Sequence, residues 1–244
     1  MNRVIKIFLL LSEFHLFAQS QPVPRWFIEQ GQVPCSNFVV QFSRPYYKDS
    51  IKPYVRYFAS KKYASSKSMT IFGANLNWKT EAGNYAVSGY EKIAFDTNAF
   101  FEIYKSNNFK INDWFVTPNN SFFALVTMED CDIPKSLLQK ERFSKKAPKW
   151  LENLPEEKGY EYCIGSCDQY YYDYRTWEEA EKHAIKQLAI MKYSKNSALM
   201  KTEDNVGDEI QDQTFQATIT NYQVISRWAD LKNGIYYVLV RIKS

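Results

Sequence analysis

The sequence predicts an α+β protein with two similar units, each a long helix packed on an antiparallel sheet. The first observation behind this prediction is that the closing strand pair, residues 221–242, resembles the earlier stretch 108–128. Aligned without gaps, the two stretches share these identities: Trp114/Trp228, Asn119/Asn233, Leu125/Leu239 and Val126/Val240. A segment that recurs in this way indicates an internal duplication.

The second observation is a helical pattern that precedes the closing strand pair. Every third or fourth residue is apolar in the set Trp177, Ala180, Ala184, Leu188 and Met191. One continuous apolar face of this kind predicts an amphipathic helix lying on a sheet. The third observation is composition, because 45% hydrophobic and 17% aromatic residues with only 8 glycines in 244 residues are typical of a folded protein.

The duplication favours two domains over one large domain, and a chain of this length has room for either. The predicted parts are a signal peptide at 1–20, a first unit at 21–132, a basic linker at 133–147 and a second unit at 148–244. A proline followed two residues later by tryptophan begins each unit, at Pro24 and again at Pro148.

Residues 1–20 are predicted to be a secretory signal peptide. A basic start leads into the apolar run 7–11, and Ala18 and Ser20 are small residues at the positions that a signal peptidase reads. Because Glu13 and a histidine interrupt the apolar core, an uncleaved anchor or a misassigned start is the alternative. No segment approaches the roughly 18 apolar residues of a membrane helix. We therefore expect a soluble protein exported to the bacterial periplasm or cell envelope.

The first unit reads as alternating strands and helices. The expected elements, in order, are a strand at 38–42, a helix capped by Asp49 or Ser50, a strand at 69–78, a Gly83-Asn84 turn, an extended stretch at 85–90, an ambiguous segment at 96–107, and a closing strand pair at 109–116 and 122–128. The closing pair is joined by a turn at 118–120.

The second unit opens with a strand from Tyr160 that runs into a Gly165-Ser166 turn. The run Thr176-Trp177-Glu178-Glu179 then has the spacing of a capping box, which predicts that the long helix begins there. After an extended or helical segment at 211–220, the last strand is apolar on both faces between Ile235 and Val240. A strand of that kind lies at the centre of a sheet that is covered on both sides.

Four cysteines lie after the signal peptide, an even number in a chain expected in an oxidising compartment. Cys163 and Cys167 are four residues apart across the expected turn, which makes them one candidate disulfide. Cys35 and Cys131 would then tie the start of the first unit to its end. Four buried thiols are the alternative, because a core of this size does not require a disulfide.

The formal charge of +4 is too weak to indicate a nucleic-acid partner. Positive charge concentrates in the linker, 133–147, where Glu141 is the only acidic residue. Such a segment suits contact with lipid phosphates or an anionic glycan, and plain solvation of an interdomain segment is the alternative.

The sequence contains no recognisable catalytic, cofactor or metal constellation. Only 2 histidines are present, and His183 alone follows the signal peptide. Histidine triads, two-histidine zinc sites and cysteine-histidine dyads are thereby excluded. The spacing of Cys163 and Cys167 is not that of a zinc knuckle or a redox motif, and no glycine-rich phosphate loop is present.

Aromatic residues form the strongest candidate interaction surface. The cluster comprises Tyr170, Tyr171, Tyr172, Tyr174 and Trp177. Tyrosine offers a rigid apolar area with a polar tip, which suits protein or glycan contacts. In a chain this rich in aromatic residues, ordinary core packing is the alternative.

The second unit resembles an exported module of the twenty-kilodalton outer-membrane lipoproteins and of the amino-terminal part of the flagellar T-ring protein. The motifs that carry the resemblance are Pro148-x-Trp150, Tyr162-Cys163-Ile164-Gly165-Ser166, Trp177-x-x-Ala180-x-x-x-Ala184-x-x-x-Leu188, and Trp228 before Tyr236-Tyr237-Val238-Leu239-Val240. The resemblance covers residues 148–242 and, more weakly, 24–128. It implies a long helix across an antiparallel sheet and carries over no catalytic residue. The first cysteine is Cys35, so this chain lacks the lipid-attachment cysteine of those lipoproteins.

The sequence thus predicts a non-enzymatic exported protein of the cell envelope that binds or assembles with another protein. The alternative from a different class is a glycan- or lipid-binding module that uses the cluster from Tyr170 to Trp177. A hydrolase with an unrecognised serine or carboxylate centre is the third and weakest hypothesis.

Overall fold

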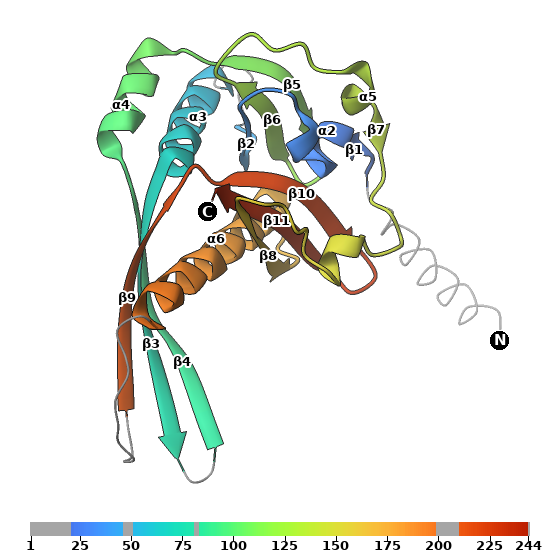
Figure 1. Cartoon of the computed structure of the whole chain (residues 1–244). Coiled ribbons are helices and arrows are strands. Elements are labelled where there is room, and N and C mark those ends of the chain that lie inside the picture. The colour runs from blue at the N-terminus through green and yellow to red at the C-terminus, as the bar shows by residue number, and fades with distance from the viewer. Residues whose placement is uncertain (1–20, 46–50, 81–82, 199–209, 244) are drawn as a thin grey trace, which may run out of the picture.

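The computed structural model describes residues 21–45, 51–80, 83–198 and 210–243. The predicted signal peptide and the predicted helix caps Asp49 and Ser50 lie outside these residues. The α+β class is confirmed, because helices pack on several small antiparallel sheets (Figure 1).

Three sheets of three strands make up most of the fold. The first sheet has the order β2 (Asn37–Ser43), β6 (Ser121–Thr127), β5 (Lys110–Val116). The second has the order β8 (Tyr160–Asp168), β11 (Ile235–Lys243), β10 (Gln223–Asp230). The third has the order β4 (Gly83–Phe95), β3 (Ser68–Thr80), β9 (Ile210–Thr220). All of these strand pairs are antiparallel.

Helices connect and cover these sheets. The longer helices are α3 (Ile51–Lys67), α4 (Thr97–Ser106) and α6 (Asp173–Ala198). The short ones are α2 (Arg25–Ile28), η2 (Gln30–Gln32), α5 (Lys135–Leu138) and η4 (Lys149–Leu151). The ambiguous segment at 96–107 is therefore the helix α4. Asp96 caps it by accepting hydrogen bonds from two backbone N–H groups, and Asn107 ends it in the left-handed conformation.

The two halves of the chain share one core. On one face of the first sheet, Phe38 and Val40 pack against Val55 and Ala59 of α3. The opposite face of the same sheet belongs to a larger cluster, in which Leu125 is joined by residues of α6 and of the second sheet. The members of that cluster from α6 and the second sheet include Ala180, Ala184, Leu188, Val238 and Val240. Helix α6 is thus packed between the two sheets.

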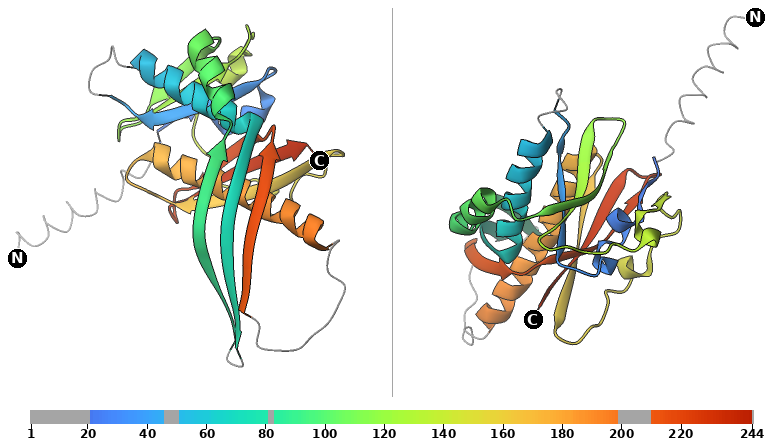
Figure 2. Two further views of the ribbon diagram at one scale, coloured as in Figure 1. Left: turned by 90° about the vertical axis from the view of Figure 1, so that its left-hand side faces the viewer. Right: turned by 90° about the horizontal axis from the view of Figure 1, so that it is seen from above.

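The third sheet forms an arm that projects from this body (Figures 1 and 2). Its central strand, β3, pairs with β4 on one side and with β9 on the other. The ladder between β3 and β9 runs from Ser68 and Thr220 at the body to Trp78 and Ile210 far from it. Segments from opposite halves of the sequence therefore share this arm.

The start of the second half differs from the prediction. Gly165 and Ser166 do not form a turn, because β8 continues through them to Asp168. The capping box is also wrong, since α6 begins at Asp173. The hydroxyl of Thr176 accepts a hydrogen bond from the backbone N–H of Tyr170.

One of the two candidate disulfides is confirmed. Cys35 and Cys131 are bonded, whereas Cys163 and Cys167 are free and buried. The second pairing was wrong because both residues lie in the strand β8. Residues four apart in a strand are separated by about 13 Å, and a disulfide requires Cα atoms within about 7 Å.

The segment 133–147 lies against the body. It contains α5, whose Leu137 is buried in the shared core, and β7 (Lys140–Glu141), which pairs with β1 (Val23–Pro24). The indole N–H of Trp228 also donates a hydrogen bond to the backbone carbonyl of Ser144 at 2.8 Å.

The first and second sheets have the same strand order and the same irregularity. Each outer hairpin strand contains a bulge, between Ile111 and Asp113 in β5 and between Val224 and Ser226 in β10. When positions are counted from the bulges, Leu125 and Leu239 occupy corresponding places in the two sheets, in agreement with the ungapped alignment of the two sequences. Trp114, however, corresponds to Arg227 rather than to Trp228, because the second hairpin loop is one residue longer.

Candidate functional site

The tyrosine cluster is only partly a surface. Tyr171 is 78% exposed, and Tyr170 and Tyr172 are exposed as well, whereas Tyr174 is half-buried. Trp177 lies in the core, where its ring contacts Phe27, Phe143 and Tyr236. The structure therefore brings three exposed tyrosines together and separates Trp177 from them.

The tyrosines are anchored to the hairpin of the first sheet. The side-chain amide of Asn119 donates a hydrogen bond to the carbonyl of Tyr171 at 2.9 Å, and the N–H of Tyr174 donates to the hydroxyl of Ser121 at 3.2 Å. A hollow of about 290 Å³ lies beside them. Its aromatic lining consists of Phe27, Phe115, Phe123, Phe143, Trp177 and Tyr236.

A second region is a buried polar network that the sequence patterns did not reveal. The carboxylate of Glu181 on α6 forms an ion pair with Lys62 on α3. It also accepts a hydrogen bond from the hydroxyl of Tyr222, between β9 and β10. Glu181 and Tyr222 are each at most 5% exposed. The network therefore joins three segments that are distant in sequence.

Arg227 extends this network beneath the amino-terminal segment. Its Nη1 donates hydrogen bonds to the carbonyl of Phe27 at 3.1 Å and to Oε1 of Gln30 at 2.8 Å. The guanidinium also lies over the Phe27 ring, 4.6 Å from its centroid. Burial lowers the pKa of Arg227 to about 10, opposed by the nearby Glu181 carboxylate, so the side chain is charged at neutral pH.

The ionisation of Tyr222 is suppressed in the same region. Burial raises the pKa of Tyr222 well above its ordinary value, and the negative charge of Glu181 acts in the same direction. The hydroxyl consequently remains a hydrogen-bond donor to Glu181 across the physiological pH range. A buried carboxylate with a cation and a donor has the partners that burial requires.

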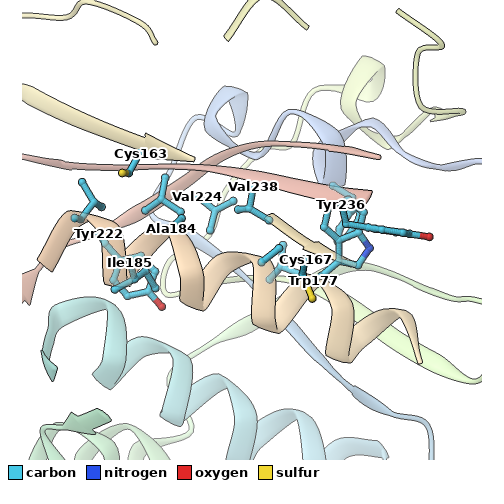
Figure 3. Packing of buried hydrophobic residues seen from close by; sticks show 14 of the residues in the cluster. Cys163, Cys167, Trp177, Ala184, Ile185, Tyr222, Val224, Tyr236 and Val238 are labelled. Carbon is cyan, nitrogen blue, oxygen red and sulfur yellow. The ribbon is translucent and has the colours of Figure 1, made fainter. Parts of the chain in front are cut away.

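A cavity of about 310 Å³ opens beside this network, between α3, α6 and the outer edge of β2. Its apolar lining includes Val39, Phe58, Met69, Ile93, Phe95 and Ile185. Its polar lining includes Gln41, Lys61, Lys62, Glu178, Glu181 and Tyr222. Figure 3 shows Ile185 on the side of α6 that faces α3, away from the side on which Ala184 packs against the strands.

Gln41 is the unusual residue of this cavity. It is 9% exposed, and neither its Nε2 nor its Oε1 has a hydrogen-bond partner. A buried amide without partners costs about 1–3 kcal/mol. The side chain is therefore held in this position at a cost to stability.

Among the described residues, Cys163, Cys167 and His183 are the remaining candidate reactive side chains. Burial raises the pKa of the Cys163 and Cys167 thiols, which disfavours the nucleophilic thiolate. His183 is exposed, with Nδ1 2.6 Å from the carbonyl oxygen of Ser166. In the part of the chain that the structure describes, no group of histidine, cysteine and acidic side chains is arranged to hold a metal ion.

The network residues left only faint signals in the sequence. Glu181 falls inside the apolar stripe of its helix, four residues after Trp177 and four before Ile185, where a charged residue is unusual. Arg227 likewise interrupts an apolar strand. Gln41 follows three apolar strand residues and gave no signal of its own.

Comparison with protein-family models, with curated proteins and with solved structures found no match for this chain. No helix within the described ranges is long and apolar enough to cross a membrane.

Proposed function

We propose that this protein is a non-enzymatic, exported cell-envelope protein that binds or assembles with another protein through its projecting arm. The observation that carries the proposal is the shape of the third sheet. Its strand β3 has 13 residues, which at about 3.3 Å per residue span roughly 43 Å. Among the residues of this sheet whose burial is described, Met69, Ile71, Ala217 and Ile219 are buried and lie near the body.

The edges of the arm supply the means of binding. Among the described strands, β4 and β9 pair only with β3, so each keeps one edge without a strand partner. The N–H and C=O groups along such an edge form hydrogen bonds with an added strand of another chain. Part of β9 is covered by α6, whose Lys192 donates a hydrogen bond to the carbonyl of Thr218. The outer edge of β4 is therefore the better candidate contact.

The proposed setting is the oxidising envelope of a bacterium. The disulfide between Cys35 and Cys131 supports an oxidising compartment. We further propose that residues 21–132 and 148–244 are two units of one duplication, joined by 133–147. The common strand order and bulge of the first and second sheets support this proposal, and we propose that both units are related to the exported envelope modules that residues 148–242 resemble in sequence.

A shortened arm tests the proposal. Gly73 and Glu91 are paired across β3 and β4, so an Asn-Gly turn can replace the residues between them. The full-length and shortened proteins would each be used to capture partners from envelope extracts. We expect a partner with the full-length protein only. Tyr171→Ala is the matched control, because it changes an exposed side chain of the body and leaves the arm intact.

Two results would count against partner binding through the arm. One is a partner retained equally by the shortened protein. The other is a full-length protein that remains a monomer without any partner at native abundance.

A second candidate function is binding of a glycan or lipid at the tyrosines. The observation that favours it is the position of the exposed Tyr171 and Tyr172, whose rings meet edge to face with centroids 4.8 Å apart, near the aromatic hollow. Changing both to alanine should abolish binding to glycan or lipid arrays while leaving partner capture unchanged. Unchanged array binding would exclude this function.

A further inference from the structure

We infer that the cavity beside Gln41 is a binding site for a small ligand that carries a primary carboxamide on an apolar body. Met69, Ile93 and Phe95 at the base of the arm line this site, but no residue of the segment removed in the shortened arm does, so the two proposals can fail separately. The inference rests on the unpartnered amide, on the lining around it and on the pairing of its neighbours.

The unpartnered amide specifies the chemistry of the ligand. Nε2 of Gln41 can donate and Oε1 can accept, and both are shielded without a partner. A carboxylate can only accept, so it would leave Oε1 unpaired, and an ammonium can only donate. A primary carboxamide offers a donor and an acceptor side by side, and so satisfies both atoms of Gln41 at once.

The neighbouring polar groups cannot perform this role for Gln41. Lys62 and Glu181 form an ion pair with each other, and the hydroxyl of Tyr222 donates to the same carboxylate. Turning Lys62 or Glu181 toward Gln41 would leave the partner charge unpaired, which costs more than an unpaired amide, and turning Tyr222 would take a hydrogen bond away from the buried carboxylate. These three groups are therefore committed to one another, and a ligand in the cavity can supply the partner that Gln41 lacks.

The rest of the cavity specifies the body of the ligand. Phe58, Phe95 and Ile185 supply an apolar wall from three different elements. The volume of about 310 Å³ is at the lower limit for small-molecule sites. A single ring with a short linker fits these limits better than a long acyl chain.

The position of the cavity in the fold supports a binding role. It lies where β2 forms the open edge of its sheet and where α3 and α6, which cover opposite faces of that sheet, both reach past the edge. In the second sheet, the residue that corresponds to Gln41 is the exposed Ser166. The buried amide is therefore a feature of one sheet and not a requirement of the common strand arrangement.

Three matched probes test the inference: 3-phenylpropanamide, its N,N-dimethylamide and 3-phenylpropanoate. Binding to the full-length protein would be measured by ligand-observed NMR and calorimetry at millimolar concentration. We expect the primary amide to bind at least tenfold more tightly than the other two, because only it satisfies both atoms of Gln41.

Two substitutions separate the ligand contact from folding. Gln41→Leu should remove the preference for the amide and raise the midpoint of urea unfolding, since it deletes an unpaired buried group. Gln187→Leu is the matched control, because Gln187 is an exposed glutamine on α6 outside the cavity lining, and it should leave the preference unchanged. Ile93→Trp should block all three probes by filling the cavity.

Several outcomes would overturn the inference. They are the absence of probe binding to the unmodified protein, equal binding of the three probes, and a preference that survives Gln41→Leu. A more stable Gln41→Leu protein together with no probe binding would mean that ordered water alone satisfies the amide.

Discussion

The first and second sheets are arranged alike but hold their helices at different distances. At the same position of the edge strand, the first sheet has Val40 and the second has Gly165. Flanking them, Phe38 and Phe42 in the first sheet correspond to Cys163 and Cys167 in the second. Small side chains let α6 lie close on β8, whereas α3 packs over bulky ones.

The difference follows from what lies on the far side of each helix. Helix α6 is packed between two sheets, while α3 covers only one sheet and has α4 beside it. A Cβ at Gly165 would lie less than 3.0 Å from the carbonyl oxygen of Ala180 and from the backbone nitrogen of Ala184. A helix confined on both sides therefore requires glycine where an outer helix accepts valine.

A second difference between the two sheets is how deeply corresponding residues of their hairpins are buried. Trp114 is 56% exposed, whereas Arg227 at the corresponding position is 1% exposed. The residues above Arg227 come from α2 and η2, which supply Phe27 and Gln30. Corresponding positions thus differ in burial because the amino-terminal segment lies over Arg227, whereas in the first hairpin it contacts Asp113 and Phe115 and Trp114 stays exposed.

The largest effect on stability is expected when Gly165 of the second sheet is replaced by valine, the residue at the corresponding position of the first sheet. Gly165→Val puts a branched side chain into the backbone of α6, and we expect a loss on the order of 5 kcal/mol in the free energy of unfolding, or failure to fold. Urea unfolding would measure it. The control is Ser166→Ala, an exposed neighbour on the opposite face, which should change stability by less than about 0.5 kcal/mol. A tolerated valine would show that α6 can move away from β8.

Removing the buried guanidinium of Arg227 should have the second largest effect on the free energy of unfolding. Arg227→Met deletes hydrogen bonds to Phe27 and Gln30 and takes a positive charge away from Glu181, at an expected cost of about 3 kcal/mol. Trp114→Ala, at the corresponding exposed position, should cost less than about 1 kcal/mol. Equal losses would contradict the idea that the amino-terminal cover makes the difference.

Breaking the disulfide should cost about 2–4 kcal/mol, because it closes a long loop around the first sheet. The double substitution Cys35→Ser and Cys131→Ser should reproduce the effect of a reducing agent on the unfolding midpoint. Replacing Cys163 and Cys167 by alanine should leave sensitivity to that agent unchanged, since both are free thiols. Mass mapping under non-reducing conditions should find a single disulfide.

The smallest effect is expected at the position where the second sheet has Tyr236 and the first has Phe122. Burial, assisted by the charge of Asp173, raises the pKa of Tyr236 from 10.0 to about 12. The raised pKa of Tyr236 stabilises the folded protein fully below pH 10. This contribution is lost as the pH rises toward 12, because the tyrosine hydroxyl loses its proton at a lower pH in the unfolded state than in the folded state. Tyr236→Phe should therefore change stability little at pH 7 and reduce the loss between pH 9 and pH 12. An unchanged alkaline profile would show that other groups cause the loss.

Local patterns in the sequence predicted much of the fold. Runs of apolar residues located β2, β5, β6 and β11, and the stripe from Trp177 to Met191 located α6. The last strand was correctly predicted to be central, and Leu125 and Val126, which recur as Leu239 and Val240, lie in the central strand of the first sheet. These features were predictable because each depends on which side of one element is apolar.

The errors concern contacts between distant segments. The turn expected at Gly165 was wrong because its glycine serves the close approach of α6 and not a change of chain direction. The surface expected at Trp177 is buried because Phe27, from the amino-terminal segment, packs against it. The polar network was missed because Lys62, Glu181 and Tyr222 become partners only after three elements have packed together.

The sequence by itself therefore determined the α+β class and the strand and helix faces, whereas the disulfide between Cys35 and Cys131 was one candidate among alternatives that it left open. Tertiary structure alone decided that β3 pairs with β9 to form the arm, that α6 is packed between two sheets, and that Gln41 is enclosed without a partner. The physical reason is that periodicity records the polarity of an element's own faces. Which surface covers each face depends on long-range packing, and so does the partner of each buried polar group.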